Sequence, residues 1–145
     1  MKLDDIRNMW SLDTKIDNTE LSTESLRIPS LHSKYYSIFT EERLRLRKYE
    51  TDMKKLRLEK YEFFTQGPTK ETQERGWVLP PVGKVIKSEV NNYIDADDDI
   101  INLTLKIGIQ QEKIELLDSI IRSLNNRGFL IKNAIDFEKF RSGTY

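Results

Sequence analysis

The sequence predicts an all-α fold of long helices, or a helical hairpin, joined by a Pro/Gly-rich connector. Residues 41–64 contain neither glycine nor proline and carry an apolar seam at helical spacing. Residues 100–124 place apolar side chains at seven of eight heptad positions, a pattern typical of helices that pack lengthwise. Glycine and proline concentrate in residues 66–85, the one clear break in composition. We therefore predict three segments: N-terminal helices (1–65), a connector loop (66–85) and C-terminal helices (86–145).

Composition narrows the class of protein. The 145 residues are 37% apolar and 33% charged, with a mean hydropathy of −0.63, which is polar for a compact globule. Such a balance is ordinary for long helices that bury their faces against other chains, so we expect much of the core to be shared between subunits. The chain has no cysteine, which excludes disulfides, zinc-finger spacing and cysteine nucleophiles. No apolar run reaches membrane-spanning length, and Asp4 and Asp5 stand where a signal peptide needs apolar residues; we expect a cytoplasmic protein.

The first half of the chain predicts three helical stretches. Leu3, Ile6 and Trp10 share one face of a helix over residues 2–11. Asp17 with Glu20 resembles a capping box, which starts a second helix near residue 18. Pro29 should kink or break that helix, because it lacks a backbone N–H. Helix resumes by residue 31, runs to about residue 65 and is stopped by the Gly67-Pro68 pair.

The second half predicts helix from residue 84, then a longer helix over residues 97–126. The acidic cluster 95–99 could collect a divalent cation, but Ile100 and Lys106 stand where a calcium loop needs glycine and glutamate, so we interpret it as a helix cap. A short strand at 103–109 is the competing interpretation of the alternating residues there. Further apolar residues off the heptad seam favour a bundle or a higher oligomer. Gly128 predicts a C-cap, after which a last amphipathic helix follows.

Basic residues gather on the helix predicted over residues 41–64. Between residues 43 and 60, eight basic residues oppose three acidic ones, which leaves a local charge of +5 in a chain of zero net charge. One interpretation is a solvated helix with ion pairs from Glu50 to Lys54 and from Glu59 to Lys55. The other is phosphate binding, with Tyr49 and Tyr61 available to stack on unpaired bases. The eight candidates are Arg43, Arg45, Arg47, Lys48, Lys54, Lys55, Arg57 and Lys60.

No constellation of residues points to catalysis. His32 is the single histidine, no serine lies in a nucleophile elbow, and the phosphate-loop spacing is absent after Gly67. We therefore predict a protein that is not an enzyme and that uses neither a metal nor another cofactor.

Short stretches of the chain form a colinear set: 2–6, 16–21, Ser33-Lys34, 87–89, Ala96-Asp97 and 127–132, with Phe140 and Gly143 near the end. Taken in order, these stretches resemble the UvsY family of phage recombination mediators. They cover nearly the whole chain, and the colinear set rather than any one motif carries the resemblance. Pro29, Trp77 and Pro80-Pro81 depart from the family pattern, and Leu58 stands where a basic residue is expected.

The resemblance implies a DNA-recombination, repair and replication function without catalysis. Proteins of this family bind single-stranded DNA, contact a single-strand-binding protein and a RecA-like recombinase, and help to form the presynaptic filament. They assemble as rings, so we expect a homo-oligomer of six or seven subunits and no membrane association. DNA binding falls on the basic helix, and above all on Lys54, Lys55, Arg57 and Lys60. Oligomerisation falls on the C-terminal half, for which the candidates are Ile114, Leu117, Ile121, Leu124, Phe129, Ile131, Ile135, Phe137 and Phe140.

One alternative remains beside this interpretation. A coiled-coil interaction or assembly protein would show the same seams and charged helix without ever binding nucleic acid. Oligonucleotide binding separates the two.

Overall fold

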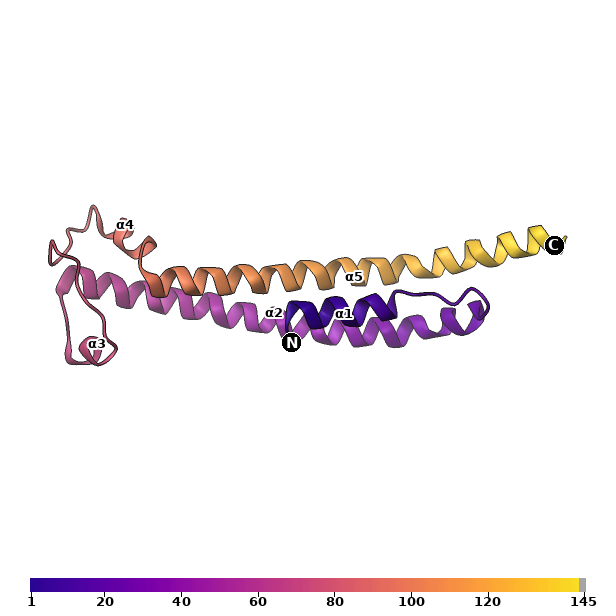
Figure 1. Cartoon of the computed structure of the whole chain (residues 1–145), viewed down its shortest axis with the longest axis horizontal. Helices are drawn as coiled ribbons and strands as arrows, with labels where there is room; N and C mark the ends of the chain where they lie inside the picture. The colour runs from indigo at the N-terminus through magenta and orange to yellow at the C-terminus, as the bar shows by residue number, and fades with distance from the viewer. Residues whose placement is uncertain (144–145) are drawn as a thin grey trace. The chain divides into compact units, whose positions relative to one another are not determined.

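The computed structural model describes residues 1–143 and is all-α in that range, which confirms the predicted fold class (Figure 1). Two long helices, α2 and α5, account for most of the chain, and the helix predicted over residues 2–11 is present as α1. The helices are α1 (Leu3–Asp13), α2 (Leu21–Gln66), α3 (Lys70–Glu74), α4 (Val90–Asp95) and α5 (Asp98–Ser142).

The chain divides into two compact units. The terminal unit comprises Met1–Leu44 and Ile109–Tyr145, and the middle unit comprises Arg45–Gly108. Both long helices contribute to both units, so this division cuts across the three segments expected from the sequence.

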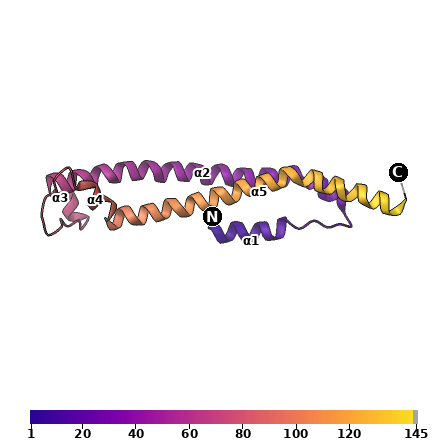
Figure 2. The same ribbon diagram turned by 90° about the horizontal axis from the view of Figure 1, so that it is seen from above.

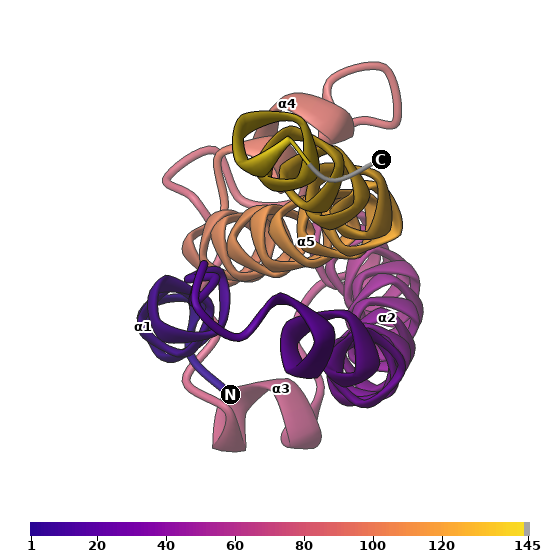
Figure 3. The ribbon, with the colours of Figure 1, turned by 90° about the vertical axis from the view of Figure 1, so that its right-hand side faces the viewer.

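The core of the terminal unit is made by three helices, which Figure 3 views end-on. Ile6 of α1 is fully buried against Leu31 and Tyr35 of α2 and against the heptad residues of α5. The Trp10 ring meets the edge of Tyr35 at 5.4 Å between centroids, close to the T-shaped geometry that aromatic pairs favour. The seam therefore packs inside the chain: its members Leu117 and Leu124 are buried here, together with Ile120, which lies off the seam.

The middle unit packs the connector against both long helices. Phe63 and Phe64, near the end of α2, are buried with Val85 of the connector and with Ile100 at the start of α5. The short helices α3 and α4 lie at this end of α2 (Figure 2). The segment predicted to be a loop thus contains α3, and its Val85 N–H donates to the Phe64 carbonyl at 2.8 Å.

Two predicted features of α2 are wrong at its beginning. The helix starts at residue 21 rather than 18, because Asp17 accepts hydrogen bonds from the backbone and hydroxyl of Thr19 in a turn, and these bonds lower the Asp17 pKa. Pro29 lies inside the continuous helix and does not break it. A proline removes one backbone bond and costs about 3 kcal/mol, but burial of Leu31 and Tyr35 in the next turns offsets that cost.

The structure also tests the predictions for the second half and for the helix caps. The helix expected from residue 84 forms only as α4. The predicted C-cap at Gly128 is wrong: α5 continues to residue 142, because Arg127 and Ile131 are buried on either side of that glycine. Residues 103–109 are helical, not a strand. Two other predicted helix ends are confirmed: α2 ends before Gly67 at φ +95°, and Asp97 accepts from the Asp99 and Ile100 N–H groups of α5 at 3.1 and 3.2 Å.

Within residues 1–143, none of the helices has an apolar stretch of the length and hydropathy that crossing a membrane requires.

Candidate nucleic-acid interface

Four basic side chains share one exposed face of α2 in the middle unit. At 3.6 residues per turn they fall within a sector of about 120° around the helix axis, with Thr51 and Leu58 between them. Glu50 and Asp52 project outside that sector. We call this surface the basic face; it consists of Arg47, Lys48, Lys54 and Lys55, all exposed.

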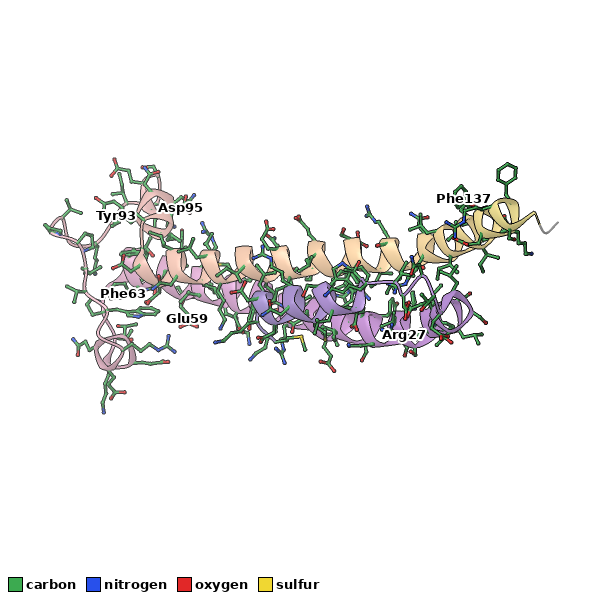
Figure 4. The ribbon with its side chains drawn as sticks, turned by 45° about the vertical axis from the view of Figure 1, so that its right-hand side comes forward. Arg27, Glu59, Phe63, Tyr93, Asp95 and Phe137 are labelled. Atoms are coloured by element: carbon green, nitrogen blue, oxygen red, sulfur yellow. The ribbon has the colours of Figure 1, made fainter. Side chains whose placement is uncertain are left out.

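The basic face is not neutralised by its neighbours. Among the described residues, neither of the ion pairs expected with Glu50 and Glu59 forms. Glu59 pairs instead with Arg75, which also binds Glu71 at 2.8 Å, and Figure 4 shows Glu59 near the end of α2. The hydrogen bond from Arg75 to Glu59, with the carboxylate charge, raises the pKa of Arg75. Glu59 is therefore paired with Arg75 of the connector, and no described carboxylate forms an ion pair with the basic face.

The other four predicted DNA-binding residues differ in their surroundings. Arg57 is half-buried and pairs with Asp95 at 3.1 Å. Arg43, in the terminal unit, lies over the Phe39 ring at 5.0 Å and remains exposed. Arg45 is exposed and lies outside the sector of the basic face.

Lys60, which was also predicted to contact DNA, is buried in the folded chain. Only 3% of the residue is exposed. Its ammonium donates to Asp99 at 2.8 Å, pairs with Asp97 at 3.1 Å and lies 3.7 Å from the centre of the Trp77 ring. The acidic cluster before α5 therefore binds a lysine of α2, in addition to capping its own helix. No three metal-ligating side chains gather among the residues described, this cluster included.

The two tyrosines proposed to stack on bases are partly covered. Lys106 lies over the ring of Tyr49 at 4.5 Å, and Tyr61 is half-buried against the core of the middle unit. Neither tyrosine is among the strongly exposed large side chains.

The predicted oligomerisation residues fall into two groups. Leu117, Leu124 and Ile131 are at most 2% exposed and belong inside the terminal unit, so they cannot face another subunit while the chain is folded. Ile114, Ile121 and Ile135 are half-buried. The phenylalanines are exposed, and Leu130 joins them on one side of α5; Figure 4 shows Phe137 pointing away from the helix. We call this surface the C-terminal apolar face; it consists of Phe129, Leu130, Phe137 and Phe140.

Sequence reasoning missed a buried charged network in the terminal unit. Arg127, 3% exposed, donates to the Asp13 carbonyl at 2.9 Å, the Lys15 carbonyl at 3.0 Å and the Glu24 carboxylate at 3.0 Å. Glu24 in turn pairs with Arg27, which Figure 4 places near the start of α2. The residues lie more than a hundred positions apart, so no local pattern could have indicated the network.

The Asp13 carboxylate, at the end of α1, accepts hydrogen bonds from Lys34 and from the buried Tyr35 of α2. Burial raises its pKa, but hydrogen bonds from Lys34 and Tyr35 and the charge of Arg27 outweigh that effect and hold the pKa below its usual value. Burial, together with the hydrogen bond to Asp13, raises the pKa of the Tyr35 hydroxyl. The tyrosine thus stays neutral and the aspartate charged over the whole neutral range.

Comparison with known proteins gives a consistent result. Residues 9–144 match the model of the family described as recombination, repair and ssDNA binding protein UvsY. Two crystal structures of the bacteriophage T4 recombination mediator protein UvsY align with TM-scores of 0.78 and 0.79 at 18% and 21% identity. The first alignment covers 97% of this chain and 99% of the other; the second covers 98% of each. No curated protein matches the sequence.

Proposed function

Because this chain belongs to the UvsY family of recombination, repair and ssDNA binding proteins, we propose that it binds single-stranded DNA through the basic face of α2. On that DNA it promotes loading of a RecA-like recombinase in place of a single-strand-binding protein. It acts as a ring-like homo-oligomer of six or seven subunits. Binding and exchange of proteins on a strand require no catalysis, in keeping with the family's description.

One observation carries the proposal: over residues 47–55, four exposed cations share a sector of α2 that holds no acidic residue, and they form no ion pair among the described residues. In a solvated helix laced with ion pairs, Glu50 would pair with Lys54 and Glu59 with Lys55, and neither pair forms among the described residues. Released counterions make such a surface bind a phosphate backbone without regard to base sequence. One subunit offers few contacts, and an oligomer that repeats the face raises the effective concentration for the same strand.

Replacing Lys54 and Lys55 together by alanine is expected to weaken oligonucleotide binding and flatten its salt dependence. Each lost phosphate contact lowers the slope of log K against log salt by about 0.7 for a single strand, hence by about 1.4 per engaged subunit. Fluorescence anisotropy with a labelled oligonucleotide at several salt concentrations measures both quantities.

The matched control removes the same charge elsewhere. Lys70 and Lys87 are exposed in the same unit but lie off the basic face, so their replacement by alanine should leave the slope unchanged. If the wild-type protein fails to bind at low salt, the chain is an assembly protein and not a DNA-binding one.

Substituting glutamate for Phe137 and Phe140 is expected to lower the mass in light scattering to that of a monomer or dimer. Both rings are exposed, at 60% and 66%, so charge there disfavours an apolar contact between copies without opening the core. Val78 is 82% exposed in the middle unit, and Val78→Glu serves as the control that keeps the wild-type mass. A double variant with the mass of the wild type would place the interface elsewhere.

A further inference from the structure

Aromatic side chains form a second exposed feature on α2, this one within the terminal unit. The ring of His32 stacks nearly parallel to that of Tyr36, with 5.8 Å between centroids and 10° between planes. Phe39 lies 6.1 Å from Tyr36, and the guanidinium of Arg43 lies over Phe39 at 5.0 Å. By helix geometry these four side chains fall within a sector of about 60°. We call them the aromatic face.

Tyr36 of this face does not pack into the core of the unit. Its sequence neighbour Tyr35 is fully buried, and the Tyr35 hydroxyl donates to Asp13 at 2.7 Å. Tyr36 is instead 48% exposed and takes no part in either core cluster, while Phe39 behind it packs partly against the core. One neighbour therefore holds α2 to the rest of the unit, and the other presents its ring to solvent.

The electrostatic surroundings of the ring favour an anionic partner. Residues 25–40 contain no aspartate or glutamate, although a third of the whole chain is charged. Glu41 projects from the opposite side of α2, and Glu42 is 1% exposed because it accepts from Gln110 inside the unit. Arg43 supplies an exposed positive charge at the end of the face. Within residues 25–43, no exposed carboxylate lies on the side of α2 that carries the aromatic face, so none there would repel a phosphate backbone.

We propose that Tyr36, supported by His32 and Phe39, stacks on an unpaired base of single-stranded DNA while Arg43 contacts the adjacent backbone. The inference rests on the proposed function and adds to it a contact with the bases, which the basic face does not supply. A ring with an open face binds any base, because every base has a π-face, so this contact is tolerant of sequence. It takes the place of the stacking first assigned to Tyr49 and Tyr61, whose rings are covered.

The test compares Tyr36→Leu with the wild-type protein on two probes of equal length, an oligothymidylate and an abasic oligonucleotide. Leucine keeps an apolar side chain and removes the π-face. Stacking of one base predicts about 5- to 150-fold weaker binding to oligothymidylate. Binding to the abasic probe, and the salt slope on either probe, should not change, since no phosphate contact is lost.

Two further variants sharpen the comparison. Tyr36→Phe retains the ring and should bind oligothymidylate as tightly as the wild type. Tyr49→Leu removes a ring that Lys106 already covers and should also leave binding unchanged.

Three results would overturn the inference. Equal affinity of wild type and Tyr36→Leu for oligothymidylate overturns it alone and leaves DNA binding through the basic face intact. A lower oligomer mass for Tyr36→Leu in light scattering would assign the aromatic face to contact between copies. Failure of the wild-type protein to bind either probe at low salt overturns the proposed function and this inference together.

Discussion

Replacing Arg127 by methionine is expected to lower the free energy of unfolding by about 3–5 kcal/mol, the range found when one partner of a buried ion pair is removed. The substitution leaves the Glu24 carboxylate, whose side chain is 8% exposed, with Arg27 as its remaining partner. It also leaves the carbonyls of Asp13 and Lys15 without the donor that now satisfies them. Urea titration followed by circular dichroism measures the loss.

The same variant should open the segment between α1 and α2 before the rest unfolds. Arg127 holds that segment through the Lys15 carbonyl, so cleavage by trypsin after Lys15 should accelerate in Arg127→Met under native conditions. Arg127→Lys keeps the positive charge but loses the planar guanidinium that donates several hydrogen bonds at once. Its rate of cleavage after Lys15 should therefore lie between those of the wild type and of Arg127→Met.

Arg122 provides the matched control on the same helix. Its side chain is 77% exposed and pairs only with the nearby Asp118 in the described part of the chain, so Arg122→Met should change stability by no more than about 0.5 kcal/mol. Equal urea midpoints for the two methionine variants would show that the network contributes no net stability.

The periodic spacing of apolar residues correctly predicted that the long helices form and which side of each is covered. The positions of the heptad seam are buried or half-buried along α5, including its single polar member. Gln110 is 2% exposed and donates to both the backbone and the carboxylate of Glu42 at 2.7 Å. A seam found by periodicity says which side of a helix is covered, and here the covering residues belong to the same chain.

Local stop signals were less reliable than periodicity. Pro29 and Gly128 predicted breaks, but each costs only about 1–3 kcal/mol within a helix. Burial of the residues beside them supplies as much, so the helices continue. Gly67 did end its helix, because the chain there turns with positive φ and Pro68 follows.

The sequence could likewise predict only part of the candidate nucleic-acid interface. Helical spacing alone could have grouped Arg47, Lys48, Lys54 and Lys55 on one face, but it could not show that Glu59 turns to Arg75 instead of Lys55. Nor could it separate the exposed lysines from Lys60, since the partners of Lys60 lie up to 39 residues away. Which cation is free and which is buried depends on contacts made only in the folded chain.

Replacing Lys60 by methionine is therefore expected to destabilise the middle unit while leaving DNA binding by the folded protein unchanged. Asp97 and Asp99 would face one another without the ammonium between them, and Trp77 would lose the cation on its ring. We expect a loss of about 2–4 kcal/mol, less than for a fully buried pair, because the Asp99 side chain is 52% exposed and keeps part of its hydration. Chemical denaturation followed by tryptophan fluorescence, with wild-type and variant proteins both carrying Trp10→Phe so that only Trp77 emits, reports on this unit.

Lys55, five residues before Lys60 on the same helix, is the exposed lysine to compare with it. Lys55→Met removes the same charge from the same helix at an exposed position, so it should change stability little and weaken oligonucleotide binding. Asp99→Asn in the Lys60→Met background relieves the repulsion between carboxylates and should recover part of the stability, which a double-mutant cycle quantifies. If folded Lys60→Met bound DNA as weakly as Lys55→Met, then Lys60 would have to leave its two aspartates to reach the phosphates, and the middle unit would have to rearrange on binding.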